Sequence, residues 1–224
     1  MIYRNLLLFI ILVPVFVNAK TSICYGTTAR GSLADGVELP YSGNNFEGYS
    51  QFARLAGRTY VHSEVYAIVT ASYQALEKTN PKKVYKYAET GFAKGGEFRP
   101  HKTHRNGLSV DFMTPVVNNA GKSVHLPTHP FNKFGYFIEF DEHDQFGGLQ
   151  IDYEAMAAHI MALHKQAIHR GHDIWRVIFD PNLQPNLFST QYGEYLKSHI
   201  QFSKKPSWVR HDEHYHVDFD IPCE

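Results

Sequence analysis

The chain has 224 residues, 43% of them hydrophobic, and its 22 lysines and arginines equal its 22 aspartates and glutamates. This length and composition suit one sizeable core. A formal charge of zero argues against a general nucleic-acid binder, which usually carries a basic excess, and gives no reason to expect attraction to an anionic membrane surface.

The N-terminus has the features of a targeting segment. Arg4 supplies a positive charge, residues 6–17 form an apolar run, and Val17-Asn18-Ala19 offers a small-residue cleavage site. The run is shorter than the ~20 apolar residues of a membrane span, which favours a signal peptide over an uncleaved anchor. We predict a signal peptide over residues 1–19 and a single domain over residues 20–224.

The two cysteines lie near the two ends of the exported chain, at Cys24 and Cys223. Free thiols are disfavoured in oxidising compartments, so we predict one bridge rather than two unpaired thiols. Closing a loop of almost the whole chain would stabilise the fold by at most about 5 kcal/mol on the entropic model.

The predicted elements alternate irregularly between helix and strand. Residues 29–48 are rich in Gly, Ser and Asn and predict irregular turns, and residues 62–78 have helical spacing that ends at Asn80-Pro81. The remaining elements are expected in this order: strand 84–87, a glycine-rich turn at 91–96, strand 109–112, a turn at 118–121, strand 134–140, helix 152–169, a buried strand at 173–180, helix 189–199 and strand 215–221. Because there is no regular βαβ repeat, we expect an α+β fold.

Strand alternation places chemistry on one face of the last strand. Side chains in a strand point to alternate faces, so His214, His216 and Asp218 share one face and the apolar residues between them share the other. If the apolar face packs on the core, the polar face opens to a cleft or to solvent. Two histidines two apart on such a face can converge on one small object.

The second candidate segment runs from His101 to Asp111. His104 and Asp111 are separated by the turn Asn106-Gly107, so a loop that returns as a strand can bring both side chains to one metal. His104, Asp111 and His216 would together form a zinc site with three protein ligands and one open position for water. Zinc lowers the pKa of such a water towards 7, which favours hydrolysis as the chemistry.

The residues beside these ligands supply candidates for proton transfer. His214 and Glu213 are alternative general bases, and the sequence leaves the choice between them open. His211 and His101 are candidates for holding an oxyanion or for hydrogen bonding to a ligand. With 14 histidines in the chain, either motif alone could arise by chance, but both together favour a metal site. Asp141 and His143 could hold a second metal, although a solvated loop explains them as well.

The two motifs together resemble those of the penicillin-insensitive murein endopeptidases. The matching residues are His101, His104, Gly107 and Asp111, followed by His211, His214 and His216. The resemblance implies a small central antiparallel sheet flanked by helices, as in D-Ala-D-Ala peptidases and the hedgehog domain. It further implies zinc on His104, Asp111 and His216, with His214 as the catalytic histidine.

The resemblance also implies a periplasmic enzyme that acts on peptidoglycan, cleaving the cross-link between D-Ala and diaminopimelate. Glu213 equally fits the base of the D-Ala-D-Ala carboxypeptidase and dipeptidase branch, so the bond that is cut stays open. The rival classes are a hedgehog-like zinc module without turnover and an exported copper- or zinc-buffering protein. We expect a monomer or dimer without stable membrane insertion, serving wall remodelling or opening the wall for a secretion machine.

Overall fold

The computed structural model describes residues 21–207 and 209–224, so the predicted signal peptide lies outside the described residues. The elements, in chain order, are β1 (Ile23–Thr27), β2 (Arg30–Ala34), β3 (Val37–Glu38), β4 (Phe46–Gly48), α1 (Gln51–Leu55), β5 (Tyr60–Val61), α2 (Ser63–Thr79), β6 (Tyr85–Tyr87), β7 (Ser109–Met113), β8 (Val116–Asn118), β9 (Ser123–Val124), the 3-10 helix η1 (Pro130–Gly135), β10 (Gln145–Phe146), β11 (Leu149–Ile151), α3 (Tyr153–His169), β12 (Asp173–Ile178), α4 (Gln184–Phe188), α5 (Gly193–His199) and β13 (His214–Asp220).

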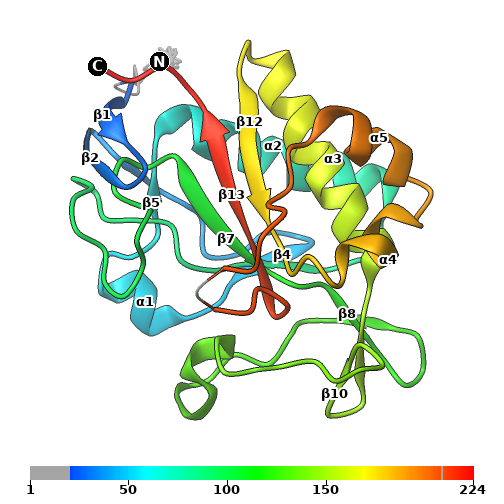
Figure 1. Ribbon diagram of the computed structural model, residues 1–224. Coiled ribbons are helices and arrows are strands. Elements are labelled where there is room, and N and C mark those ends of the chain that lie inside the picture. Colours follow the sequence, from blue (N-terminus) through cyan, green and yellow to red (C-terminus); the bar gives the residue numbers. More distant parts are fainter. Residues whose placement is uncertain (1–20, 208) are drawn as a thin grey trace, which may run out of the picture.

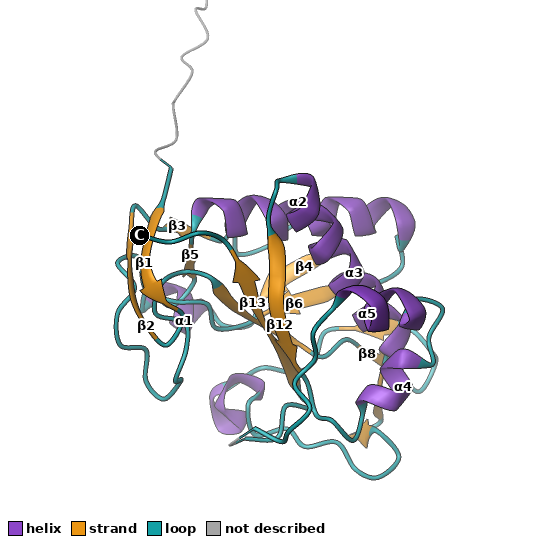
Figure 2. Ribbon diagram, turned by 45° about the horizontal axis from the view of Figure 1, so that its top comes forward, coloured by secondary structure: helices purple, strands orange, loops and turns teal. Residues whose placement is uncertain are grey.

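A five-stranded sheet in the order β12-β13-β7-β6-β4 forms the centre of the molecule (Figure 1). Its strands pair antiparallel except β4 and β6, which run parallel. A smaller sheet, β10-β11-β8-β9, lies beyond one end of the central strands. Figure 2 shows α2, α3 and α5 gathered to one side of the central sheet. The fold is therefore α+β, as predicted from the sequence.

The two long helices bury apolar stripes against this sheet. The side chain of His62 caps α2 by accepting from the Glu64 amide, and the side chain of Asp152 caps α3 by accepting from the Ala155 amide. The helices pack on each other and on the apolar face of β7 and β13, where His159 of α3 contacts Phe112 and Tyr215. The opposite face of these two strands is thereby left for the polar side chains.

The predicted bridge is confirmed, since Cys24 and Cys223 form a disulfide with their Cα atoms 4.8 Å apart. Backbone hydrogen bonds join the same two ends, from Gly26 N to Glu224 O and from Glu224 N to Cys24 O, each 2.9 Å long. Among the described residues, no helix has both the length and the apolar character needed to cross a membrane.

The strand predicted at 134–140 is wrong. This segment continues from η1 through Lys133 and Phe134, both at positive φ, and then wraps the fold without pairing to a strand. Ile138 and Phe140 are buried at 1% and 2% exposure, whereas Phe137 before them is 62% exposed and Glu139 between them is exposed. The aromatic and β-branched composition that predicts a strand here belongs instead to a 3-10 helix and a loop that bury some of these side chains.

Three smaller expectations also need correction. Residues 29–48, expected to be irregular, contain the short strands β2, β3 and β4. These strands are only two to five residues long and lie between turn-forming residues, so the turn signals dominate the sequence. The buried strand expected at 173–180 spans Asp173–Ile178 and lies at the edge of the central sheet. It is not buried on both faces, since Trp175 is 48% exposed. The helix expected at 189–199 begins only at Gly193 and follows the separate helix α4.

Candidate metal centre

Asp111 and His216 meet because β7 and β13 are adjacent. The two residues are directly paired in the antiparallel register, and the Nδ1 atom of His216 lies 2.8 Å from Oδ1 of Asp111. Both side chains are buried on the sheet face opposite the helices. Burial alone would raise the pKa of Asp111, but His104 and His214 hold it well below its usual range, so the carboxyl is ionised.

His104 reaches the same carboxylate from the loop that precedes β7. The loop turns at Gly107, whose φ is +78°, and a Cβ there would come 2.7 Å from the His62 amide nitrogen. His104 itself adopts a positive φ of 68°, a conformation that is uncommon outside glycine and concentrates at functional sites. Its Nε2 atom lies 3.2 Å from Oδ1 of Asp111.

The hydrogen-bond partners of His104 and His216 determine which ring nitrogens carry hydrogen. Nδ1 of His104 is 2.9 Å from the Thr90 carbonyl, and Nε2 of His216 is 2.9 Å from Oδ1 of Asp218. The Thr90 carbonyl only accepts, so Nε2 of the neutral His104 ring carries a lone pair. His216 lies between two accepting carboxylates, so its Nδ1 atom carries a proton unless a cation replaces that proton. Nε2 of His104 and Nδ1 of His216 converge on Oδ1 of Asp111.

Three electron-rich atoms facing one another require a positive charge between them. The Nε2 atom of His104 is buried and makes no hydrogen bond. Burial opposes a charge on His216, but Asp218 and Asp111 raise its pKa to about 10. A proton on His216 can therefore occupy part of this space. A metal ion takes the same place and satisfies both histidines at once, so this donor set fits a cation.

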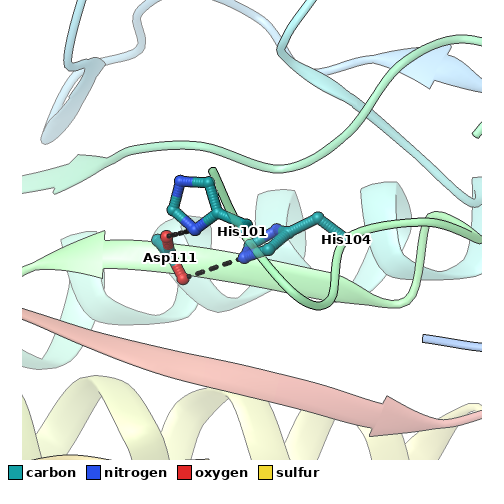
Figure 3. A group of neighbouring side chains, drawn as sticks. All are labelled: His101, His104 and Asp111. Atoms are coloured by element: carbon teal, nitrogen blue, oxygen red, sulfur yellow. Dashed lines mark ion pairs between the residues drawn. The ribbon is translucent and has the colours of Figure 1, made fainter. Parts of the chain in front are cut away.

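His101 stands beside the same carboxylate. Its Nδ1 atom is 3.8 Å from Oδ2 of Asp111, while Nε2 is 2.9 Å from the Glu89 carboxylate. His101, His104 and Asp111 form a group whose ligand atoms all lie within 4.8 Å of one another and could hold a metal ion (Figure 3). Burial would raise the pKa of Glu89, but His101 and Arg58 lower it to about 2, which keeps this anchor for His101 ionised.

A second carboxylate, that of Asp218, binds the ring nitrogen of His216 that faces away from Asp111. Asp218 is fully buried and accepts hydrogen bonds from Ser109 Oγ at 2.5 Å, His216 Nε2 at 2.9 Å and Arg176 Nε at 2.7 Å. Burial opposes its charge, but His216 and Arg176 hold the pKa of Asp218 well below its usual range. A carboxylate that fixes the outer nitrogen of a histidine in this way is typical of metal-ligating histidines.

Tyr136 closes the other side of Asp111. Its hydroxyl oxygen lies 2.9 Å from Oδ2, and its ring contacts those of His214 and His101 at centroid distances of 4.9 and 5.8 Å. Burial raises the pKa of Tyr136 well above its usual value, so the phenol keeps its proton.

His214 and Glu213 form a buried pair next to this carboxylate. Nδ1 of His214 lies 2.8 Å from Oε1 of Glu213, and Nε2 of His214 points towards Asp111, 3.9 Å from its Oδ2 atom. Burial raises the pKa of Glu213 to about 8 and lowers the pKa of His214 to about 4. The geometry allows His214 to move a proton while Glu213 fixes its ring.

His211 packs against His214, with ring centroids 4.5 Å apart. Its Nδ1 atom is 2.9 Å from the Val209 carbonyl, which only accepts, so Nδ1 carries the hydrogen. Burial lowers the pKa of His211 to about 3, which keeps the ring neutral with an accepting Nε2 atom. His211 also lines a pocket of about 200 Å³ together with Asp180, Asn182 and Arg210.

The structure brings together the residues that the two motifs single out, namely His101, His104, Asp111, His211, Glu213, His214 and His216. It places Asp141 and His143 elsewhere, in an exposed turn where the Asp141 side chain accepts from the His143 and Gln145 amides. Sequence reasoning missed Glu89 and Tyr136, because neither belongs to a motif and both reach the site from segments without a recognisable pattern.

Comparison with known proteins identifies a family. Over residues 24–224 the chain matches the family model described as penicillin-insensitive murein endopeptidase. No curated protein matches the chain. The matched range includes both histidine motifs and both cysteines, so the resemblance inferred from those motifs is confirmed.

Proposed function

The chain belongs to the family of penicillin-insensitive murein endopeptidases, and from this premise we propose that it is a zinc-dependent hydrolase of peptidoglycan cross-links. The bond we propose is the one between D-Ala and diaminopimelate. The observation that supports the zinc dependence is the convergence of two ring nitrogens on one buried carboxylate oxygen of Asp111: Nε2 of His104, which has no hydrogen-bond partner, and Nδ1 of His216.

We propose His104, Asp111 and His216 as the zinc ligands. Two imidazoles and one carboxylate are a donor set typical of catalytic zinc, which keeps a further position open for water. When bound, zinc would supply a Lewis acid that lowers the pKa of this water. His101 lies on the Oδ2 side of Asp111 with a side chain 16% exposed, a position that suits contact with substrate or with the open position.

His214 is the general base of this proposal. Its Nε2 atom faces the carboxylate of Asp111, where it can accept a proton from the attacking water and return it to the leaving amine. Glu213 accepts from Nδ1 of His214 and fixes the ring, so we assign it an orienting role rather than that of the base.

His211 contributes to substrate binding in this proposal. A neutral ring with an accepting Nε2 atom suits a peptide N–H rather than an oxyanion. The adjacent pocket of about 200 Å³ has room for a side chain of the stem peptide.

We further propose that residues 1–19 direct export to the periplasm. The compartment that holds peptidoglycan is oxidising, and the bridge between Cys24 and Cys223 suits it.

The deciding experiment incubates purified residues 20–224 with intact sacculi, with and without a chelator, and identifies the released muropeptides. Conversion of cross-linked dimers into monomers, abolished by the chelator and restored by zinc, supports the proposal. Loss of terminal D-Ala alone would identify a carboxypeptidase instead. The absence of any zinc-dependent change would refute the enzyme.

Single variants test the roles within the site. His214→Ala should lower the rate by about 10²–10⁴ with the metal still bound, whereas Glu213→Gln should have a smaller effect because the amide oxygen can still accept from the ring. A larger loss in Glu213→Gln than in His214→Ala would reverse the two assignments. His169→Ala, in the exposed last turn of α3, is the matched control and should leave the rate unchanged.

A further inference from the structure

We propose that Tyr136 is a positioning residue that assigns the two oxygens of Asp111 to different tasks and leaves Oδ1 alone to bind the metal ion. This inference rests on the zinc centre proposed above. It concerns a residue outside both histidine motifs, on a loop between β9 and β10.

The direction of the hydrogen bonds made by Tyr136 follows from its partners. Its hydroxyl oxygen lies 3.3 Å from the Glu89 amide nitrogen and 2.9 Å from Oδ2 of Asp111. An amide N–H only donates and an ionised carboxylate only accepts. The hydroxyl therefore accepts from Glu89 and donates its own hydrogen to Oδ2.

The two oxygens of Asp111 consequently have separate environments. Oδ1 faces the Nδ1 atom of His216 at 2.8 Å and the Nε2 atom of His104 at 3.2 Å, which are the two nitrogens that we propose as metal ligands. Oδ2 receives a charge-assisted hydrogen bond from Tyr136, a strong class of hydrogen bond. A metal ion that bound both oxygens would have to compete with this bond.

The phenol is held in place by its surroundings. The ring of Tyr49 packs edge-on against it at a centroid distance of 6.2 Å, and the rings of His214 and His101 contact it as well. The preceding residue, Gly135, has a φ of +102°, and a Cβ there would come 3.0 Å from Met113. The chain therefore reaches Tyr136 along a path that only glycine readily permits.

The Oδ2 side of Asp111 is also the side of the proposed chemistry. Nδ1 of His101 and Nε2 of His214 lie 3.8 and 3.9 Å from Oδ2. If Asp111 turned Oδ2 towards the metal, that oxygen would take up a coordination position on the side where His214 must meet water. Tyr136 prevents this by keeping Oδ2 occupied.

The test compares Tyr136→Phe with the wild-type protein, using Co²⁺ in place of zinc as a visible probe. Both proteins should bind one metal ion per chain. In Tyr136→Phe the freed Oδ2 raises the coordination number, so the visible absorption of bound Co²⁺ should weaken. Cleavage of sacculi at saturating zinc should fall by about 10–100-fold, the usual effect of removing a group that orients a metal ligand.

Tyr195→Phe is the matched control. Tyr195 lies on α5 and its hydroxyl lies 2.7 Å from Nδ1 of His164 on α3, so the substitution removes a phenol that is bonded to a histidine of the helices and not to Asp111 of β7. The Co²⁺ spectrum and the cleavage rate of this variant should match the wild type.

An unchanged Co²⁺ spectrum in Tyr136→Phe would overturn the inference, whatever the rate. A lost rate with an unchanged spectrum would place Tyr136 on the substrate rather than on Asp111. The Co²⁺ spectrum is recorded without substrate, so it tests the role of Tyr136 even if the wild-type protein has no activity on sacculi. A wild-type protein that binds metal and does not cleave sacculi would refute only the proposed function.

Discussion

A buried histidine on the opposite face of the sheet from the proposed metal centre makes the stability of this fold dependent on pH. His159 on α3 is 0% exposed, and its ring lies among those of Tyr73, Tyr85 and Phe112, with centroid distances of 5.0, 5.1 and 4.7 Å. Its Nδ1 atom is hydrogen-bonded to the Tyr215 hydroxyl and its Nε2 atom has no partner. Burial lowers the pKa of His159 from 6.5 to about 3.

This shift gives the direction and the size of the effect. Below pH 6.5 the unfolded chain binds a proton at this position and the folded chain does not, so the free energy of unfolding decreases as the pH falls. The slope is about 1.4 kcal/mol per pH unit until the folded pKa is reached. Between pH 7.5 and 4.5, His159 should therefore lower the free energy of unfolding by about 3 kcal/mol.

The assay is urea unfolding at these two pH values for the wild type and for the double variant His159→Phe with Tyr215→Phe. Replacing both partners of the hydrogen bond by apolar rings of similar shape should be nearly neutral at pH 7.5. On acidification, the double variant should then lose about 3 kcal/mol less of its free energy of unfolding than the wild type. Histidines of the metal centre titrate in both proteins, so the difference between them isolates His159.

Tyr215→Phe alone is the control, because it retains His159 and should keep the acid sensitivity of the wild type. Equal losses in the wild type and the double variant would show that His159 takes up its proton without unfolding. That result would refute the reasoning from burial.

Four further predictions concern the metal centre and the disulfide. Zinc at 100 times its dissociation constant should add about 2.7 kcal/mol to the free energy of unfolding, and a melting temperature indifferent to chelator would contradict this. His104→Ala should remove bound metal, as measured by elemental analysis of protein shown by circular dichroism to be folded; one tightly bound ion remaining would be inconsistent with its role. Asp218→Asn should weaken zinc binding by about 10–100-fold in chelator competition, and an unchanged affinity would mean that His216 needs no such support. Cys24→Ser should lower the free energy of unfolding by about 2–5 kcal/mol in denaturant titration, whereas no change would show that the backbone bonds between the chain ends suffice.

The parts of the fold that could be predicted are those governed by local patterns. Helices α2 and α3 follow from apolar spacing and their end signals, and β13 follows from strict alternation over seven residues. Alternation also predicted correctly that Tyr215 and Val217 face the core while His214 and His216 face the site. Each of these features follows from the helical or strand periodicity of apolar residues, which can be read from the sequence alone.

What could not be predicted depends on contacts between distant segments. The pairing of Asp111 with His216 depends on the register of two strands whose paired residues are 105 positions apart in the sequence. The sequence suggested this pairing only because both residues are of types that bind zinc. Glu89 and Tyr136 act through the groups they touch in space, and no spacing in the sequence marks them. The secondary structure predicted around Tyr136 was wrong, because aromatic and β-branched residues, which are typical of strands, occur here in a 3-10 helix and a loop.

The covalent link between Cys24 and Cys223 decides how this protein can be attached to a surface. The described chain begins and ends at one point of the fold, where the two Cα atoms are 4.8 Å apart. β13 carries the chain from His214 to that point, a length of roughly 20 Å for seven residues. An affinity tag or bead linker fused after Glu224, or before residue 20 of the processed chain, should therefore immobilise the molecule with His214 directed away from the support and accessible to a large polymeric substrate.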